Sequence, residues 1–381
     1  MKKNIKWIWQ DARYPQFDYD IQKIVPLLTQ IAYNTGRLDE LTAQLDDTRN
    51  TEFKVESLTK EIITSNEIEG AYLDRKSVRS SVCKKLDEAF DHSQDTSTHY
   101  TDALVDILID SNLNHEALTI ERIHSWHHAL FPGNHSSMHK INAGCFRDYD
   151  DMHIVSGAIG REKIHYVGLP HERIKDDMDR LLAYINTSQE DPYIKSSISH
   201  LWFASIHPYD DGNGRIARVI ADYVLSRELD LNYKYYSVSS AINIDRKGYY
   251  NTLEQSQNLI YNRNFDFTKW ILWHLHTFDR AIELSIENIN IVIDKTRFWD
   301  RVDQAKLNER QIKILNRLAD AGANSCVENF EGGLTAKKYM AITKVSKATA
   351  TRDIKELHTM GFIEQVAGSA GRNTRYDIII D

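Results

Sequence analysis

The segment HPYDDGNGRIAR, residues 207–218, combines a histidine, two aspartates, a glycine–asparagine–glycine turn and two arginines. It lies between two stretches with helical periodicity, 192–206 and 214–229, so its second half opens the second helix. Glycines let neighbouring backbone N–H groups point into one concavity, and a helix N-terminus adds a partial positive charge. The segment therefore predicts an anion site, suited to phosphate, at a turn between two helices.

The side chains around this turn predict chemistry on a phosphate group. Arg215 and Arg218 are three residues apart at the start of a helix, so both guanidinium groups can hold phosphate oxygens. Asp211 offers an oxygen ligand for a Mg²⁺ ion that bridges phosphates. His207 ends the preceding helix and can accept a proton from a hydroxyl near neutral pH. Together these residues predict phosphoryl or nucleotidyl transfer.

The same residues could instead form an ordinary corner between two helices. His207 would then be a hydrogen-bonded core histidine, Asp211 a helix cap, and the arginines surface charges. We favour the phosphate site because the full set occurs together and in order. Two other nucleotide-binding patterns are absent: no glycine–lysine–serine/threonine run occurs, and the Gly-x-Gly lacks the third glycine and preceding strand of a dinucleotide site.

The segment resembles the signature of the Fic family, H-x-F-x-D/E-G-N-G-R-x-x-R, with Tyr209 where phenylalanine is usual. Residues 144–147, GCFR, resemble the approach to a β-hairpin that the family uses as a flap. Tyr249 and Tyr250 resemble the tyrosine pair of an adenine pocket, with Gln257 one helical face further on. The residues that resemble the flap itself are Lys163, Ile164, His165 and Tyr166.

This resemblance implies that the protein transfers AMP from ATP to a serine, threonine or tyrosine hydroxyl of a target protein, and to itself. His207 would deprotonate that hydroxyl, and Asp211 would hold Mg²⁺. Asn213 and the loop amides would grip the α-phosphate, Arg215 would contact the α/β-phosphates and Arg218 the γ-phosphate. The flap would clamp the target by strand addition, which reads the backbone of the target and little of its sequence. The residues assigned to ATP are Asp211, Gly212, Asn213, Gly214, Arg215, Arg218, Tyr249, Tyr250 and Gln257.

A second motif, TSNEIEG at residues 64–70, lies at the end of a predicted helix. It resembles the inhibitory motif of the family, S/T-x-x-x-E-G/N, with Ser65 and Glu69 at the defining positions. A Glu69 carboxylate paired with Arg218 would remove the arginine meant for the γ-phosphate and would repel ATP. The alternative is an ordinary helix end with an exposed glutamate and a glycine stop.

The sequence leaves the direction of the reaction open. Glu69 could instead activate water, so that the same site removes AMP from a modified protein. A rival of another class is a regulator whose nucleotide site only senses ATP. The Gly-Asn-Gly-Arg run and the tyrosine pair favour AMP over phosphate or another nucleotide.

The fold class that follows is mainly α: a Fic-type helical bundle with a small β-hairpin flap, then a winged-helix domain. We expect N-terminal helices in residues 1–95, with the inhibitory helix at about 51–70, a catalytic core in 96–298 and the winged helix in 304–381. The residues of this last part that would suit DNA contact are Lys347, Thr349, Thr351, Arg352, Arg372 and Arg375. Its charge is only modestly positive, so protein docking or a structural role is favoured over DNA binding.

Composition describes an ordinary globular protein. The net charge of −8 argues against bulk attraction to nucleic acid, and no stretch resembles a signal peptide or a membrane span, so we expect a cytoplasmic protein. The cysteines, Cys83, Cys145 and Cys326, lie far apart and make no metal pattern. The target protein is not encoded recognisably, and a homodimer is an open possibility.

Three weaker signals are interpreted as structural. His124, His127 and His128 form an H-x-x-H-H cluster that could hold a metal, but no neighbouring carboxylate or cysteine completes a ligand set. His200 is expected to pack on the same helix face as the motif histidine. Arg147 could support the site or form an ion pair with the next residue.

Overall fold

The structure is a computed structural model of the chain, and it describes residues 6–86, 91–136, 139–150, 152–157, 161–229, 235–302, 306–321, 333–371 and 374–379. Cys326 and Arg372 lie outside these residues. Contacts divide the chain into two units, Met1–Gly36 with Asp47–Ile282, and Arg37–Asp46 with Glu283–Asp381. The first unit holds the segment 207–218.

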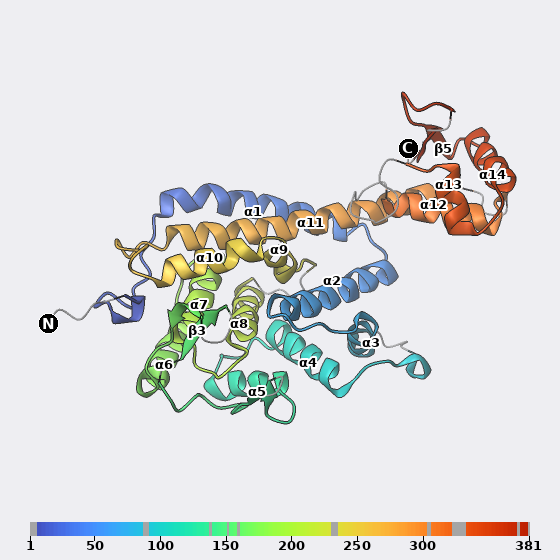
Figure 1. Cartoon of the computed structure of the whole chain (residues 1–381). Coiled ribbons are helices and arrows are strands. Elements are labelled where there is room, and N and C mark those ends of the chain that lie inside the picture. The colour runs from blue at the N-terminus through green and yellow to red at the C-terminus, as the bar shows by residue number, and fades with distance from the viewer. Residues whose placement is uncertain are drawn as a thin grey trace. The chain divides into compact units, whose positions relative to one another are not determined.

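The first unit consists mainly of α-helices, which confirms the predicted fold class (Figure 1). Its helices, of which α1 and α11 continue beyond it, are α1 (Ile21–Thr42), α2 (Asp47–Ile68), α3 (Arg75–Leu86), α4 (His99–Leu113), α5 (Ile120–Leu130), α6 (His171–Thr187), α7 (Pro192–Ile206), α8 (Asn213–Glu228), α9 (Val238–Ile244), α10 (Arg246–Gln257) and α11 (Thr268–Arg301). Two short 3₁₀ helices are η1 (Ile8–Gln10) and η2 (His92–Gln94). The strands form two antiparallel hairpins, β1 (His135–Ser136) with β2 (His139–Lys140), and β3 (His153–Ser156) with β4 (Lys163–Val167).

Helix α7 forms the core of the first unit. Every residue from Tyr193 to Ile206 is buried, so the helix is enclosed on all sides, and α8 packs along it. Its start is well capped, because Pro192 needs no N–H partner and the Asp191 carboxylate accepts from the backbone N–H groups of Tyr193 and Ile194. A helix held in this way provides a rigid base for the loop that follows it.

Apolar periodicity predicted most of these helices, with two departures. Thr119 opens the helical pattern of residues 119–130 and is therefore predicted to be its N-cap. The structure confirms this cap, since the Thr119 hydroxyl accepts from the N–H of Arg122 at 3.2 Å. Helix α9 was missed because it is too short for an apolar face to repeat. The apolar pattern predicts a helix near residues 266–286, whereas α11 runs to Arg301, because buried residues such as Ile289 continue its apolar face.

A chain of hydrogen bonds joins α7, α10 and α11 inside the first unit. Ser197 Oγ lies 2.9 Å from His274 Nδ1, His274 Nε2 lies 3.3 Å from His200 Nδ1, and His200 Nε2 lies 3.0 Å from the Tyr249 hydroxyl. Both imidazoles are fully buried. Burial lowers the pKa of His274 to about 3 and the pKa of His200 well below its ordinary range, so the fold holds both rings neutral.

These two histidines make stability depend on pH. In the unfolded chain each has a pKa of about 6.5, so below that value the unfolded state binds more protons than the folded state. We expect full stability above about pH 6.5 and a loss as the pH falls, each histidine adding up to about 1.4 kcal/mol per pH unit. Urea unfolding at several values between pH 7.5 and 5 measures this slope. His274→Gln should make the slope shallower by about one proton, and an unchanged slope would contradict the assignment.

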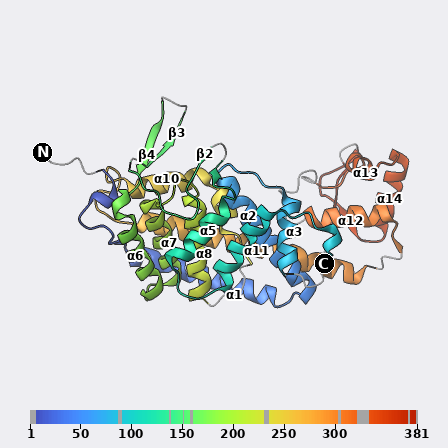
Figure 2. The same ribbon diagram turned by 90° about the horizontal axis from the view of Figure 1, so that it is seen from below.

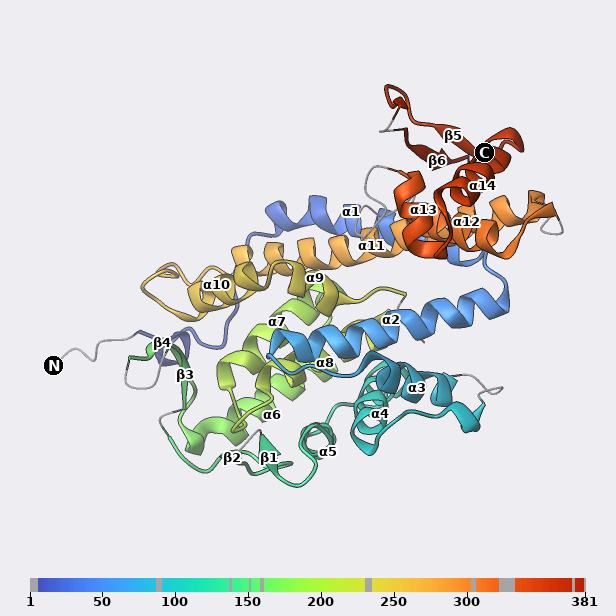
Figure 3. The same ribbon diagram turned by 45° about the vertical axis from the view of Figure 1, so that its right-hand side comes forward.

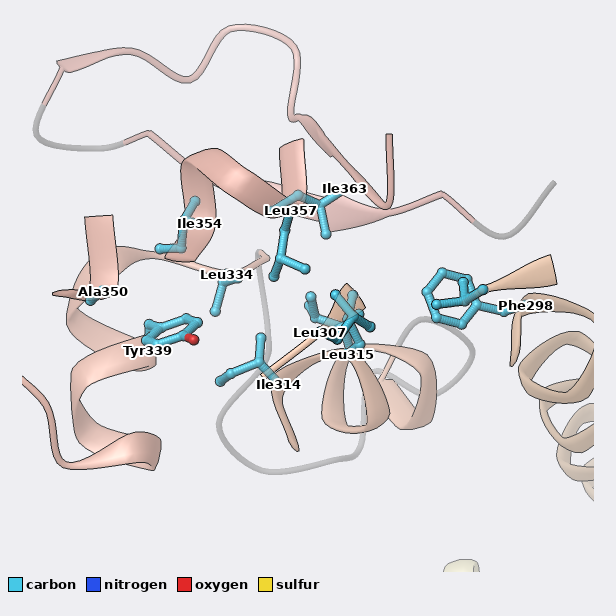
Figure 4. Packing of buried hydrophobic residues seen from close by; sticks show 12 residues of the cluster. Phe298, Leu307, Ile314, Leu315, Leu334, Tyr339, Ala350, Ile354, Leu357 and Ile363 are labelled. Carbon is cyan, nitrogen blue, oxygen red and sulfur yellow. The ribbon is translucent and has the colours of Figure 1, made fainter. Parts of the chain in front are cut away.

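The second unit has its own core (Figure 4). Its elements, besides the end of α11, are α12 (Glu309–Ala321), α13 (Ala336–Thr343), α14 (Lys347–Thr359), β5 (Ile363–Gln365) and β6 (Tyr376–Ile378). Strands β5 and β6 pair antiparallel, and Leu334 adds a bridge to Tyr376. Apolar residues such as Ile314, Leu357 and Ile363 fill the centre. Along the chain, α12, α13 and α14 precede the β5–β6 pair.

Within the part of the chain that the structure describes, no helix has both the length and the apolar character that a membrane crossing requires.

Candidate active site

His207 is the residue at which α7 ends, and its backbone is left-handed, with a φ of 53°. The buried Arg147 supports this strained turn: its Nε donates to the His207 carbonyl at 3.0 Å, and its backbone N–H donates to the Pro208 carbonyl at 2.9 Å. Of the two roles that the sequence left open for Arg147, the contacts favour support of this turn.

The His207 imidazole is held as a neutral base. Its Nδ1 lies 3.2 Å from the Ala204 carbonyl, which can only accept, so Nδ1 carries the proton and Nε2 has a free lone pair. Burial lowers the pKa of His207 to about 4, and the positive Arg147 acts in the same direction. At neutral pH the ring can therefore accept a proton from a hydroxyl placed at Nε2.

Asn213, the first residue of α8, closes the loop between α7 and α8. Its Oδ1 accepts from the backbone N–H of Tyr209 at 3.0 Å, and its Nδ2 donates to the Tyr209 carbonyl at 2.8 Å. The side chain assigned to the α-phosphate is thus engaged with the loop itself. The first N–H groups of a helix have no partner within the helix, so the start of α8 can still offer backbone donors to an anion. Gly212 has a φ of 78°, which residues with a Cβ rarely adopt.

Asp211 suits a metal that arrives with phosphates. Its carboxylate accepts from the Ser136 hydroxyl and from the N–H of Gly212. Among the described residues, no group of three or more His, Cys, Asp or Glu side chains could hold a metal alone. Mg²⁺ is commonly bound by one or two carboxylates together with substrate phosphates, so a single aspartate at this place fits such an ion.

Two buried arginines provide positive charge beside the start of α8. Arg215 is 7% exposed and Arg218 is 4% exposed. Arg215 Nη1 reaches Asn66 Oδ1 at 3.4 Å, and its guanidinium lies 4.8 Å above the Phe131 ring. Arg215 Nε and Arg218 Nη1 are buried without a hydrogen-bond partner. Buried donors without partners are costly, so the site has unused capacity for an anion.

Helix α2 lies beside α9 and is bonded to it (Figure 3). The buried Glu61 carboxylate accepts from the Ser237 hydroxyl at 2.7 Å and from the Ser239 N–H at 3.0 Å, at the N-terminus of α9. One turn and a half further on, Asn243 Nδ2 donates to Glu67 at 3.1 Å. These bonds set the position of the C-terminal end of α2.

At that end, Ser65 and Glu69 bind the second arginine of the motif. Arg218 Nε donates to the Ser65 hydroxyl at 3.0 Å, and Nη2 donates to the Ser65 carbonyl at 2.8 Å and to Glu69 Oε1 at 2.9 Å. The Glu69 carboxylate also lies against Gly214, where an added Cβ would collide with it. A carboxylate therefore occupies the first turn of α8, where the sequence predicts a phosphate.

The predicted adenine-pocket residues take different positions. Tyr249 is buried, whereas Tyr250 is 39% exposed and its hydroxyl donates to the Ile68 carbonyl at 3.0 Å. Gln257 is buried, and its Nε2 donates to Ser205 Oγ at 3.1 Å. The structure thus brings Tyr250 to the end of α2 and engages the Gln257 side chain with Ser205 on α7.

The hairpin β3–β4 stands out from the helical body (Figure 2). Two of the predicted flap residues tie it to α10: Lys163 Nζ lies 3.2 Å and His165 Nδ1 lies 2.6 Å from the Glu254 carboxylate. Tyr166 is buried, and its hydroxyl donates to the Ser205 carbonyl, so it anchors the hairpin. Lys163 and Ile164 are the exposed members of the predicted set, and Ile164, at 42% exposed, offers an apolar side chain to a partner.

Some residues at the site were not assigned to it from the sequence. Ser136 and Glu254 carry no local signal, because their partners Asp211 and His165 lie far away in the chain. His127 was visible in the H-x-x-H-H cluster but was interpreted as packing.

Comparison with known proteins places the site within a family domain. Residues 117–225 match the model of the Fic/DOC family, and residues 7–87 match a domain of unknown function (DUF4172). A curated relative, a uridine 5'-monophosphate transferase from Xanthomonas campestris pv. campestris, is 33% identical over 66 residues. That match covers 15% of this chain, and the chain spans about 12% of the length of the relative.

Three solved structures have a similar fold. A Fic family protein from Desulfovibrio desulfuricans G20 has a TM-score of 0.56 at 18% identity, over 96% of this chain and 98% of that chain. A Fic domain containing signalling protein from Bacteroides thetaiotaomicron has a TM-score of 0.51 at 18% identity, over 68% and 97%. Fic-1 from C. elegans has a TM-score of 0.50 at 18% identity, over 70% and 73%. The chain therefore contains a Fic/DOC domain.

Proposed function

We propose that this protein is an autoinhibited adenylyltransferase that transfers AMP from ATP to a hydroxyl of a target protein and of itself. The observation that carries the proposal is the Glu69 carboxylate, which lies at the N-terminus of α8 on Arg218. A site that holds an acid at a helix N-terminus among buried arginines is suited to a phosphate. The neutral His207 ends the helix before it.

The reaction needs one proton transfer and one displacement at phosphorus. Nε2 of His207 takes the proton of the target hydroxyl, and the hydroxyl oxygen forms a bond to the α-phosphorus of ATP. The bond between that phosphorus and pyrophosphate breaks, and pyrophosphate leaves. The backbone N–H groups at the start of α8 and the Arg215 guanidinium stabilise the charge that develops on the α-phosphate oxygens. Asp211 would hold a Mg²⁺ ion that is bound with the nucleotide, and that ion would supply positive charge for the leaving pyrophosphate.

Inhibition follows from competition for Arg218. While its Nη2 donates to Glu69, that arginine is not available to the γ-phosphate, and the carboxylate repels the phosphates. ATP bound in this state would lack the contact that aligns the α-phosphorus with the target hydroxyl. Movement of the end of α2 would restore the contact.

A relative named as a uridine 5'-monophosphate transferase makes UTP the rival of ATP as the nucleotide substrate. We expect the Glu69→Gly variant to incorporate label from the α-phosphate of ATP and none from the γ-phosphate. Unlabelled ATP should compete with this labelling at least ~10-fold better than UTP, which corresponds to about 1.4 kcal/mol. Better competition by UTP would make the protein a uridylyltransferase. Label from the γ-phosphate would make it a kinase.

For the second unit we propose a winged helix in residues 304–381 that docks a protein, separate from a catalytic core in 96–298. Arg352 on α14 is exposed and lies 3.7 Å from Asp353 and 3.8 Å from Glu356, two acidic groups that would repel a DNA phosphate. This favours protein docking over DNA, and a gel shift with mixed duplexes at several salt concentrations would reveal DNA binding.

A further inference from the structure

His127, near the C-terminal end of α5, makes two hydrogen bonds that have no role in the proposed reaction. The ring of His127 is fully buried and both of its nitrogens are engaged. The backbone N–H of Gly144 lies 2.9 Å from Nδ1 and can only donate, so Nδ1 is unprotonated. Nε2 therefore carries the proton and donates to the Asp211 carbonyl at 3.0 Å. One side chain thus joins the loop before the flap to the candidate metal ligand.

The same face of α5 contacts three successive parts of the motif. His127 stacks on Tyr209, with 3.8 Å between ring centroids and 7° between planes. Phe131, four residues later, lies so close to Gly212 that an added Cβ would come within 2.7 Å of its ring. The Arg215 guanidinium lies 4.8 Å above the same Phe131 ring.

We propose that His127 and Phe131 are positioning residues, which set the place of the Asp211–Gly212 backbone and of the Arg215 guanidinium. The inference rests on the proposed function, since it gives these groups the Mg²⁺–nucleotide as their ligand. The bond to the Asp211 carbonyl holds the residue that must aim a carboxylate at the metal. Groups that orient a metal ligand typically change metal affinity by about 10- to 100-fold when they are removed.

The test uses the Glu69→Gly chain as parent and two matched variants. His127→Phe keeps the aromatic stack on Tyr209 and removes both hydrogen bonds, while His128→Phe makes the same change at an exposed neighbour. In the ligand-free protein, amide hydrogen exchange of residues 209–214 should be faster in His127→Phe than in His128→Phe. The Mg²⁺ concentration that half-saturates binding of α,β-methylene-ATP should rise about 10-fold or more in His127→Phe and stay unchanged in His128→Phe.

Two further variants distinguish loss of the hydrogen bond to Asp211 from a general loss of folding. His127→Gln can still donate to the Asp211 carbonyl and should recover part of the Mg²⁺ affinity. Phe131→Leu should weaken nucleotide binding through Arg215 with a smaller effect on the Mg²⁺ requirement. Equal exchange rates and equal Mg²⁺ requirements for His127→Phe and His128→Phe would overturn the inference. A parent that binds the analogue with Mg²⁺ but transfers no label would overturn the proposed function and leave the positioning role supported by binding.

Discussion

Replacement of Glu69 by glycine is expected to raise the rate of AMP transfer by about 100-fold, equivalent to about 2.7 kcal/mol. The change removes the carboxylate 2.9 Å from Arg218 Nη2 and frees the first turn of α8 for a phosphate. A charge-assisted hydrogen bond between the buried Arg218 guanidinium and the partly exposed Glu69 carboxylate accounts for an effect of this size. The measurement is the initial rate of self-modification with ATP labelled at the α-phosphate.

Glu67→Gln is the matched control for this prediction. Glu67 lies on the same last turn of α2, but it binds Asn243 and not the motif arginine. We expect its effect on the rate to be below about 2-fold, because a glutamine side chain keeps an oxygen that can accept the hydrogen bond from Asn243. Equal rates for Glu69→Gly and the wild type would refute the inhibitory role. If Glu69 serves instead to activate water, Glu69→Gly should lose the ability to remove AMP from a modified protein, which a release assay on the labelled protein detects.

The arrangement of the motif residues could be predicted from the sequence, because these residues are close together in the chain. A helix, a glycine turn and a second helix bring His207, Asp211 and Arg215 into one place through spacing alone. Glu69 is different, since it is 149 residues from Arg218 in the chain. No periodicity predicts that contact, and only the resemblance to a family connected the two residues.

Side chains on the predicted helices were harder to assign, because tertiary packing decides which face is buried. Gln257 lies on α10 as expected, yet it faces Ser205 in the interior. The side-chain amide of Asn213 bonds to the backbone of Tyr209 and so closes the loop. The resemblance to a nucleotide-binding motif assigned this side chain to the α-phosphate and gave no sign of the local role. The sequence shows that Arg147 is a charged residue, but it does not show that its side chain donates to the His207 carbonyl, which is 60 residues further along the chain.

His207→Ala in the Glu69→Gly chain is expected to reduce AMP transfer by about 1000-fold, within the range for loss of a general base. Nucleotide binding should change little, because the anion-binding groups of α8 and Arg215 remain. The burial that lowers the pKa of His207 to about 4 also predicts the pH profile. A base with this pKa stays unprotonated as the pH falls, so the rate of the Glu69→Gly chain should be nearly constant from pH 8 to about 5 and should drop below that. Single-turnover rates across this range give the profile, and a half-maximal rate near pH 6.5 would mean that the catalytic histidine is not held neutral by the site. Substantial transfer by His207→Ala would show that another group takes the proton of the target hydroxyl.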